Sequence, residues 1–533
     1  MATEKKIVEL KELSGKIVQI GIDNLVPQTK SGYIGIDRRA DTVEQVEKQT
    51  INQVANDRTM QQNFEIVLHQ STRQQIDWQN SVLALKVKFC KRTSTDVNST
   101  DDGGAVVITA TDNVSFTYPT SLFQEMRLTV DGKTLDRVVS PSHVLHDKIV
   151  TGEIPYEWVK SFGVTSGLMP DTSEHTLKHL HAGDFKYEAD SKTDTSVAWR
   201  TLLVNASNAA IPAPAAPANT DLTITPSGTK WGITNEGRAR AHDLIVNGEV
   251  AGNWTVVPFA IPLRYIFDIF NVHRFVPHFE EVKIEFTYAN NRTEFLKVPA
   301  DNKVDANSLG ATCQLSYAAV WATQYHLSPQ DEILISKLKQ SDAIYPFRTW
   351  NVSSVQFQNG TSQFLYTQDH IGLIRSTYYI TPAVDSTSYR SQFICTGAAA
   401  ATDYVRTKKV SLDERQIATK SVDNPRYTHW YNYRELLRSV PAYQGSLQAI
   451  FMDEYKYRTL SYNIVNTHIM PSIMTEEGSR LRCDTRKRQL TEELNFAGNL
   501  SAQHYGKHIL VSENYVYSAF DKASGKVGSS LLL

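Results

Sequence analysis

Apolar and polar residues alternate along several segments of the chain, and this pattern predicts β-strands. Phe64, Ile66 and Leu68 occupy every second position of one such segment, as expected for a strand with one buried face. Residues 82–89 form a run rich in apolar and β-branched side chains, which is also typical of strands. Helical patterns are fewer and shorter. The pattern therefore predicts an all-β protein with short helices.

One pair of strands is marked by the turn between them. Met126, Leu128 and Val130 alternate with polar residues, and Asp131-Gly132 follows directly. Glycine accepts a positive φ angle at little cost, so an Asp-Gly pair between two strands favours a tight hairpin turn. We therefore expect a β-hairpin centred on these two residues.

Three short segments carry helical signals. Two of them follow a Ser-Pro pair, which favours a helix start because serine caps free N–H groups and proline suits the first helical position. Acidic residues in a first turn also favour the positive end of a helix dipole. The three expected helices are residues 142–150, 173–183 and 330–339.

The segment from Pro258 to Asn290 combines a helical pattern with a strand pattern. Its first part has apolar residues at i, i+3, i+4 and i+7, which form one face of a helix. Its second part alternates as a half-buried strand does. No residue in it suggests catalysis, so we interpret it as structural. The expected helix face is Leu263, Ile266, Phe267 and Phe270, and the expected strand face is Val282, Ile284, Phe286 and Tyr288.

The strand-rich part of the chain divides into two halves of similar length, separated by a polar stretch. Many short strands with long loops suit sandwiches of the jelly-roll kind. The expected division is an N-terminal arm (1–54), a first jelly roll (55–290) with long loops at 91–104 and 205–221, a linker (291–309), a second jelly roll (310–520) and a C-terminal tail (521–533).

Composition narrows the class of protein. The chain has 533 residues, of which 41% are hydrophobic and 21% charged, enough for a large core. Its formal net charge of −2 argues against a protein whose main function is to bind nucleic acid, because such proteins neutralise phosphates with an excess of basic residues. The N-terminal residues show no signal peptide, and no apolar run is long enough to span a bilayer.

The four cysteines form no CxxC motif, so we expect no structural zinc, no disulfides and a reducing compartment. No phosphate-binding loop, dinucleotide-binding motif or nucleophile elbow is present in the sequence. Nothing points to a cofactor or to a catalytic pair of carboxylates, and we therefore expect no enzymatic activity.

Several segments resemble, in order, the double jelly-roll major capsid proteins of Polinton-like elements, adintoviruses and virophages. That family has a strand near an Ile-Asp pair, a hairpin after a Ser-Leu-Phe segment, and a Pro-Leu segment that leads through a helix into the last strand of the first barrel. The resemblance therefore implies that 258–290 holds the closing helix and strand of the first jelly roll. The matching segments are QQIDWQNSVLALKVKF (74–89), YPTSLFQEMRLTVDGKTLD (118–136) and IPLRYIFDIFNVHRFVPHFEEVKIEFTY (261–288), with weaker matches at 343–357 and 427–438.

The resemblance implies two tandem jelly-roll β-barrels that stand side by side. It further implies a homotrimer that forms pseudo-hexameric capsomers, which tile an icosahedral shell around double-stranded DNA. Penton and minor capsid proteins are the implied partners, and the DNA is enclosed without sequence-specific binding. The implied location is the virion capsid, after synthesis in the host cytoplasm and assembly in the cytoplasm or the nucleus. Loop 205–221 is expected at the outer tip of the first barrel, and membrane contact is left open.

Two groups of residues suggest a functional role, but each also has a purely structural interpretation. Histidines spaced four apart share a helical face and can bind a metal, yet they also occur as ordinary surface or core residues. A basic cluster fits either a solvated loop or edge strand, or contact with DNA or an acidic neighbour on the inner face of the shell. The histidines are His175, His179 and His181, and the basic cluster is Arg480, Arg482, Arg486, Lys487 and Arg488.

Two other classes of protein remain as alternatives to a capsid protein. One is a carbohydrate-binding jelly-roll attachment protein, and the other is a β-sandwich glycoside hydrolase. A glycan-binding signal from a protein that does not assemble would favour the first. Turnover that is lost when one Glu or Asp is replaced would favour the second.

Overall fold

The structure is a computed structural model of the chain. It describes residues 40–49, 63–92, 105–108, 115–116, 118–139, 154, 156–169, 244–245, 248–288, 296–297, 311–340, 343–356, 363–371, 373–380, 405–412, 415–421, 464–468, 487–496, 507–521, 526–527 and 531–532.

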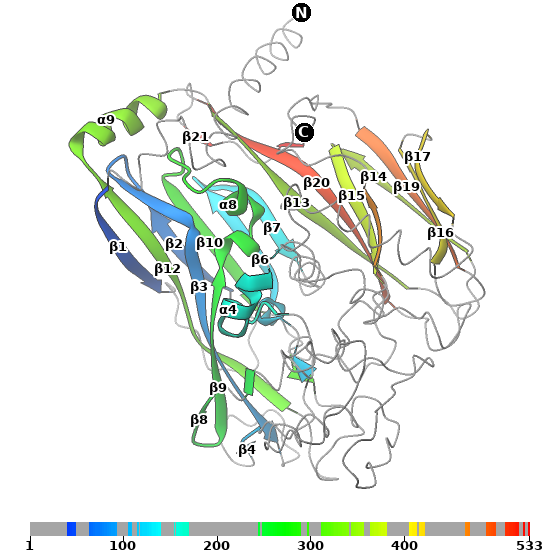
Figure 1. Cartoon of the computed structure of the whole chain (residues 1–533), viewed down its shortest axis with the longest axis horizontal. Helices are drawn as coiled ribbons and strands as arrows, with labels where there is room; N and C mark the ends of the chain where they lie inside the picture. Colours follow the sequence, from blue (N-terminus) through cyan, green and yellow to red (C-terminus); the bar gives the residue numbers. More distant parts are fainter. Residues whose placement is uncertain are drawn as a thin grey trace, which may run out of the picture.

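Two antiparallel sheets form the first barrel, drawn in blue to green in Figure 1. Its strands are β1 (Ala40–Gln49), β2 (Asn63–His69), β3 (Gln74–Arg92), β4 (Ala105–Val106), β6 (Phe123–Val130), β7 (Lys133–Val139), β8 (Glu249–Ala251), β9 (Trp254–Pro262), β10 (Glu281–Tyr288) and β12 (Ala311–Leu327). One sheet has the order β1-β12-β3-β9-β8, with β4 beside β3, and the other has the order β2-β10-β6-β7. The short strands β5 (Ser115–Phe116) and β11 (Leu296–Lys297) pair separately.

Two further sheets form the second barrel, which lies beside the first in Figure 1. Its strands are β13 (Ala343–Gln356), β14 (Gln363–Ile371), β15 (Leu373–Ile380), β16 (Val405–Leu412), β17 (Arg415–Ser421), β18 (Ile464–His468), β19 (Lys487–Phe496), β20 (Lys507–Asp521), β21 (Lys526–Val527) and β22 (Leu531–Leu532). The sheet orders are β13-β20-β15-β18 and β14-β19-β16-β17, and β21 and β22 both pair with β20.

The two barrels share one topology. When the two- and three-residue strands are left out, the described part of each barrel has eight strands. Numbered one to eight along the chain, these strands follow the order 1-8-3-6 in one sheet and 2-7-4-5 in the other, in both barrels. An eight-stranded double sheet with this Greek-key connectivity is a jelly roll. The chain therefore has the double jelly-roll fold that was expected.

The boundary between the barrels differs from the expected one. Strand β12 lies in the range assigned to the second jelly roll, yet it pairs with β3 and β1 of the first. Leu315 and Val320 of β12 belong to the core of the first barrel. The expectation that the strand within 258–290 closes the first barrel is therefore wrong, because β12 follows β10 in the same barrel. The stretch 291–309 lies between two strands of one barrel and does not link the two barrels. An apolar pattern shows that a strand is buried, but it does not show which sheet the strand joins.

The two ends of the chain also contribute strands that were not expected. Residues 40–49, which we assigned to the N-terminal arm, form β1 at the edge of the first barrel. In the segment 521–533, which we assigned to a tail, β21 and β22 pair with β20. These strands are short or weakly alternating, so that only their partners identify them.

Several local predictions are confirmed. Strand β2 buries Phe64, Ile66 and Leu68, and β10 buries the expected face of four apolar residues. Asp131 and Gly132 have φ angles of 48° and 78° and join β6 to β7 as a two-residue turn, the type I′ geometry of tight hairpins.

The helix expected at 330–339 is α9 (Pro329–Leu338). The Ser328 side chain accepts a hydrogen bond from Asp331 N at 3.3 Å, and Asp331 and Glu332 lie in the first turn. This is the capped start that the Ser-Pro pair indicated. The helices expected at 142–150 and 173–183 fall outside the described residues, as do loops 91–104 (apart from its first two residues) and 205–221.

The helix expected over 263–270 is wrong as a continuous element. The segment forms a 3-10 turn, η4 (Leu263–Tyr265), and then a short helix, α8 (Asp268–Val272), with Phe267 extended between them. All four residues of the predicted face are buried, but Tyr265 and Ile269 on the opposite side are buried too. Because the segment is enclosed on all sides, its pattern does not require one helical face.

Candidate functional site: the junction between the two barrels

Two of the segments that carried the family resemblance meet in the first barrel. Asp77 follows Ile76 in β3 and is fully buried. Arg274, which lies just after α8, donates hydrogen bonds to Asp77 Oδ2 from Nε at 2.9 Å and from Nη2 at 2.7 Å. Asn80 Nδ2 donates to the same carboxylate at 2.8 Å. A buried carboxylate needs such partners, so this pair fixes α8 and its flanks against the end of β3.

Strand β13, the first strand of the second barrel, packs against the residues that follow α8. The Tyr345 hydroxyl forms a hydrogen bond with His278 Nδ1. The Tyr345 ring makes edge-on contacts with His273 and Phe279, each at a centroid distance of 5.2 Å. His278 also lies 4.4 Å from the ring of Phe520 in β20, measured between centroids. One tyrosine therefore joins both barrels through aromatic and polar contacts.

A buried ion pair lies further along β13. Arg348 Nη2 donates to Asp268 Oδ1 at 2.5 Å, and the backbone N–H of Arg348 donates to Asp268 Oδ2 at 2.8 Å. The two side chains are only 5% and 1% exposed. The extended backbone at Phe267 makes Asp268 the first residue of α8, which directs this carboxylate to β13. Because an unpaired buried charge costs several kcal/mol, the pair favours one position of β13 on α8.

The next residue of β13 contacts the edge strand β7 of the first barrel. Thr349 Oγ1 donates to Asp136 Oδ1 at 3.0 Å. The same carboxylate oxygen accepts the backbone N–H of Arg137 at 2.7 Å. Asp136 is only 3% exposed. Successive residues of β13 therefore bind α8 and β7 in turn.

The apolar core is continuous across this junction. Phe347 and Trp350 of β13, Phe520 of β20 and Val527 of β21 belong to the same buried cluster as the core of the first barrel. Buried apolar area stabilises a contact by about 25 cal/mol per Å². A shared core with buried polar contacts at its edge makes the two barrels one packed unit rather than two domains on a linker.

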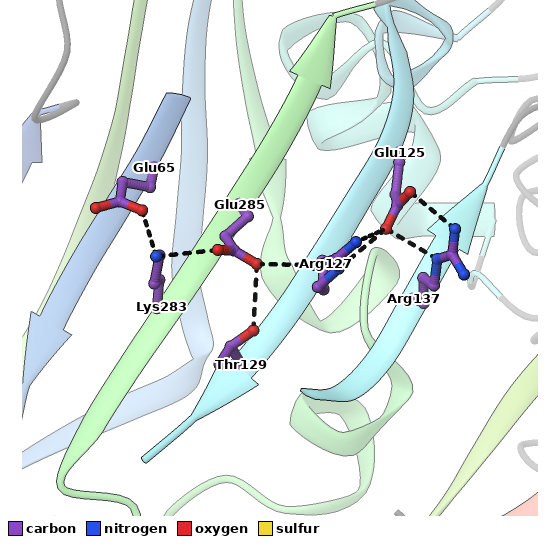
Figure 2. Close-up of polar contacts among 7 residues, drawn as sticks. All are labelled: Glu65, Glu125, Arg127, Thr129, Arg137, Lys283 and Glu285. Atoms are coloured by element: carbon purple, nitrogen blue, oxygen red, sulfur yellow. Dashed lines mark hydrogen bonds and ion pairs between the residues drawn. The ribbon is translucent and has the colours of Figure 1, made fainter. Parts of the chain in front are cut away.

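The outer face of the β2-β10-β6-β7 sheet carries a second polar arrangement, which Figure 2 shows. Glu65 and Glu285 lie directly opposite each other on β2 and β10, and Lys283 contacts both carboxylates. Arg127 and Arg137 lie opposite each other on β6 and β7. Like charges opposite one another are destabilising unless a neighbour neutralises them.

Glu125 supplies that neutralisation for the two arginines. Its Oε1 lies 2.9 Å from Arg127 Nη2 and 2.8 Å from Arg137 Nε. Burial acts to raise the pKa of Glu125, but the hydrogen bonds and charges of Arg137 and Arg127 hold that pKa below its ordinary value. The hydrogen bond from Lys283 to Glu65, and then that to Glu285, raise the pKa of Lys283. The three carboxylates and three cations of this arrangement thus balance in charge, and they help to fix the register of the sheet.

The residues proposed from sequence as functional are not among the described contacts of the junction. Arg480, Arg482 and Arg486 fall outside the described residues, as do His175, His179 and His181. Lys487 and Arg488 open β19, where their backbones pair with Ile371 and His370. Strand β19 lies between β14 and β16 in its sheet, so these two residues are not on an edge strand. No described contact brings the basic cluster to the junction.

Sequence reasoning missed the junction because its partners are far apart in the chain. Asp268 and Arg348 are separated by 80 residues, and Asp136 and Thr349 by 213. The local signal was an acidic residue, Asp268, within a largely apolar segment. In the described part of the chain, no three His, Cys, Asp or Glu side chains are grouped as a metal site would require. No helix in that part is long and apolar enough to cross a membrane.

The chain was compared with protein-family models, curated proteins and solved structures. No protein-family model and no curated protein matches the chain. Among solved structures, a chain in the cryo-EM structure of the Sputnik virophage matches with a TM-score of 0.51 and 8% identity, over 93% of this chain and 89% of that one. The mavirus major capsid protein matches with a TM-score of 0.49 and 8% identity, over 95% and 92%.

A quasi-atomic model of the PBCV-1 virus capsid matches with a TM-score of 0.47 and 10% identity, over 94% of this chain and 98% of that one. The match to the Sputnik virophage chain spans both barrels, and at its low identity it concerns the fold. It agrees with the repeated strand order and confirms the double jelly-roll fold that the sequence resemblance implied.

Proposed function

We propose that this protein is the major capsid protein of a DNA virus and that it acts as a homotrimer. The observation that carries the proposal is the presence of two complete jelly rolls in one chain, joined by a continuous buried core. The fold shared with a chain of the Sputnik virophage supports the same role. In this role the chain is a building block of a shell.

The two-barrel unit has a direct geometric use in a shell. Three copies related by a three-fold axis bring together six similar barrels, which gives a nearly hexagonal block. Cyclic closure lets one heterologous contact repeat without leaving an open end. Such blocks can tile an icosahedral surface around double-stranded DNA. A fixed angle between the two barrels is then a requirement, and the buried contacts of β13 with α8 and β7 would supply it.

This role requires burial and surface complementarity rather than chemistry on a substrate. We therefore propose that the protein is not an enzyme and needs no cofactor. A carbohydrate-binding attachment protein and a glycoside hydrolase are not favoured, because no observation on the described residues supports either one. The further partners that we propose are other copies of the trimer, penton proteins and minor capsid proteins, in the virion.

We also propose positions in the shell for the basic cluster and for loop 205–221. Residues 480–488 would contact the inner side of the shell, where enclosed DNA or an acidic neighbour offers negative charge. Loop 205–221 is bracketed in sequence by β7 and β8, and with three prolines it cannot extend a sheet. We propose that it projects outward from the first barrel.

Static light scattering of the purified chain tests the proposed assembly. We expect a mass three times the chain mass of 60.0 kDa, and negative-stain images should show nearly hexagonal particles. A strict monomer at high protein concentration and moderate salt would contradict the capsid assignment. In that event a glycan-binding screen and a glycosidase assay would separate the two alternative classes.

A further inference from the structure

The junction contains a buried carboxyl group that lacks a full set of partners. Asp136 lies on β7 and is 3% exposed. Its Oδ1 accepts two hydrogen bonds, from Thr349 Oγ1 at 3.0 Å and from Arg137 N at 2.7 Å. Its Oδ2 is buried and has no hydrogen-bond partner among the described residues. A buried oxygen in this state is poorly suited to carry negative charge.

A second buried carboxyl group lies close to it. Asp268 on α8 is 2% exposed and already binds both the guanidinium and the backbone N–H of Arg348. Burial raises the pKa of the Asp136 carboxyl to about 7, and the negative charge of Asp268 adds to that rise against the hydrogen bonds of Arg137 N and Thr349. The described contacts assign the guanidinium of Arg348 to Asp268, which leaves Asp136 without a paired cation.

We propose that the contact between the two barrels depends on a proton on Asp136. With the proton on Oδ2, the carboxyl group is neutral and β7 stays packed against β13. When the proton leaves, Asp136 becomes a buried negative charge without a paired cation near the charge of Asp268, and the contact between β7 and β13 weakens. The proposal concerns the chain itself and does not rest on its role in a capsid.

The direction of the pH dependence follows from the raised pKa. In the opened junction water reaches Asp136, and its pKa returns toward the ordinary value of 3.8. The closed junction therefore binds more protons between that value and about pH 7, so the contact weakens as pH rises through this window. Above about pH 8 both forms are ionised and the dependence ends.

The other charged groups near β7 do not offer Asp136 a cation. The Arg137 side chain lies on the outer face and pairs with Glu125. On β6 the residue opposite Asp136 is Leu128, and the charged residues Glu125 and Arg127 of that strand belong to the outer face. On β13 the charged group is Arg348, and on α8 it is Asp268. His273 and His278 surround Tyr345, at the start of β13, and they need a separate control.

Hydrogen–deuterium exchange of the full chain measures this contact directly. The readout is the protection of the peptide that covers 343–350, corrected for the intrinsic pH dependence of exchange, at about pH 6 and about pH 8.5. The titration of one carboxyl group, with a pKa of about 7 in the closed junction and 3.8 in the opened one, predicts an approximately tenfold loss of protection across this interval. The Asp136→Asn variant mimics the neutral carboxyl group and should abolish the loss.

Two further variants make the test specific. Asp131→Asn alters an acid whose pKa is also raised by burial, in the turn of the same hairpin and bound to β10, and it should keep the tenfold change. His278→Gln should keep it as well. A flat wild-type profile would overturn the proposal without any variant. An unchanged pH dependence in Asp136→Asn, or its loss in His278→Gln alone, would also overturn it.

Discussion

Phe267 is fully buried, and its ring meets that of Phe270 edge-on at a centroid distance of 6.2 Å. Its burial could be predicted, because it lies in a dense run of apolar residues. Its extended backbone could not, since the pattern of the segment equally suits a helix. The extended residue matters because it is followed by Asp268, whose carboxylate binds the second barrel.

Replacing Phe267 with alanine should destabilise the protein by about 3–5 kcal/mol, the usual cost of removing a fully buried phenylalanine side chain. Chemical denaturation of the purified variant would measure the change. Phe162 on α4 (Tyr156–Ser166) is the matched control, because its side chain is 55% exposed. Phe162→Ala should change stability by no more than about 0.5 kcal/mol. Equal effects of the two changes would mean that Phe267 is not a core residue.

Single strands were the most predictable elements. The two-residue period of β2, β6 and β10 identifies both the strands and their buried faces, because one face meets the core and the other meets water. The strands with which a given strand pairs are harder to predict from sequence. Nothing in the sequence of β12 says that it pairs with β3 rather than with strands that follow it, because pairing depends on register and topology rather than on local pattern.

Two glycines allow a prediction about turns. Gly132 closes the β6–β7 hairpin with φ +78°, and a Cβ atom there would meet nothing within 4 Å. Gly167 follows α4 with φ +69°, and a Cβ atom there would lie 2.7 Å from Pro119 Cγ. Gly132→Ala should therefore cost only the backbone strain of about 1–2 kcal/mol. Gly167→Ala adds a steric clash of about 1–3 kcal/mol.

The comparison of melting curves for the two variants tests this difference. The Gly167→Ala protein should be the less stable of the two by at least about 1 kcal/mol. If Gly132→Ala proved the more damaging, the hairpin turn would contribute more than its local strain. The result tests these two turns and not the junction, since neither glycine is among the described contacts that join the barrels.

At the scale of the whole molecule, the two barrels repeat one strand order without a visible repeat in sequence. A common architecture can persist when the residues that fill it change, because a core requires apolar side chains of suitable volume and position rather than particular residues. The sequence therefore predicted two halves of one kind. It did not predict the junction, because each contact there joins a residue of the first half to a residue of β13 or β20 at long separation.

The shared core leads to a prediction about cooperativity. Since Phe347, Trp350 and Phe520 pack in the same cluster as the first barrel, neither barrel can unfold without exposing part of the core of the other. Scanning calorimetry of the native protein should therefore show one main transition. Arg348→Ala leaves Asp268 as an unpaired buried charge, which costs about 3–5 kcal/mol, and should lower the melting temperature and separate the barrels into two transitions.

Arg137→Ala is the matched control, because its side chain is 57% exposed on the charged outer face. Surface ion pairs contribute about 0–1 kcal/mol, so this variant should keep a single transition near the native temperature. Both variants must be compared in the same oligomeric state, since association itself shifts a melting curve. Two transitions in the native protein would mean that the barrels behave as separate domains. A single unshifted transition in Arg348→Ala would mean that the apolar contacts of β13 hold the barrels together without the ion pair.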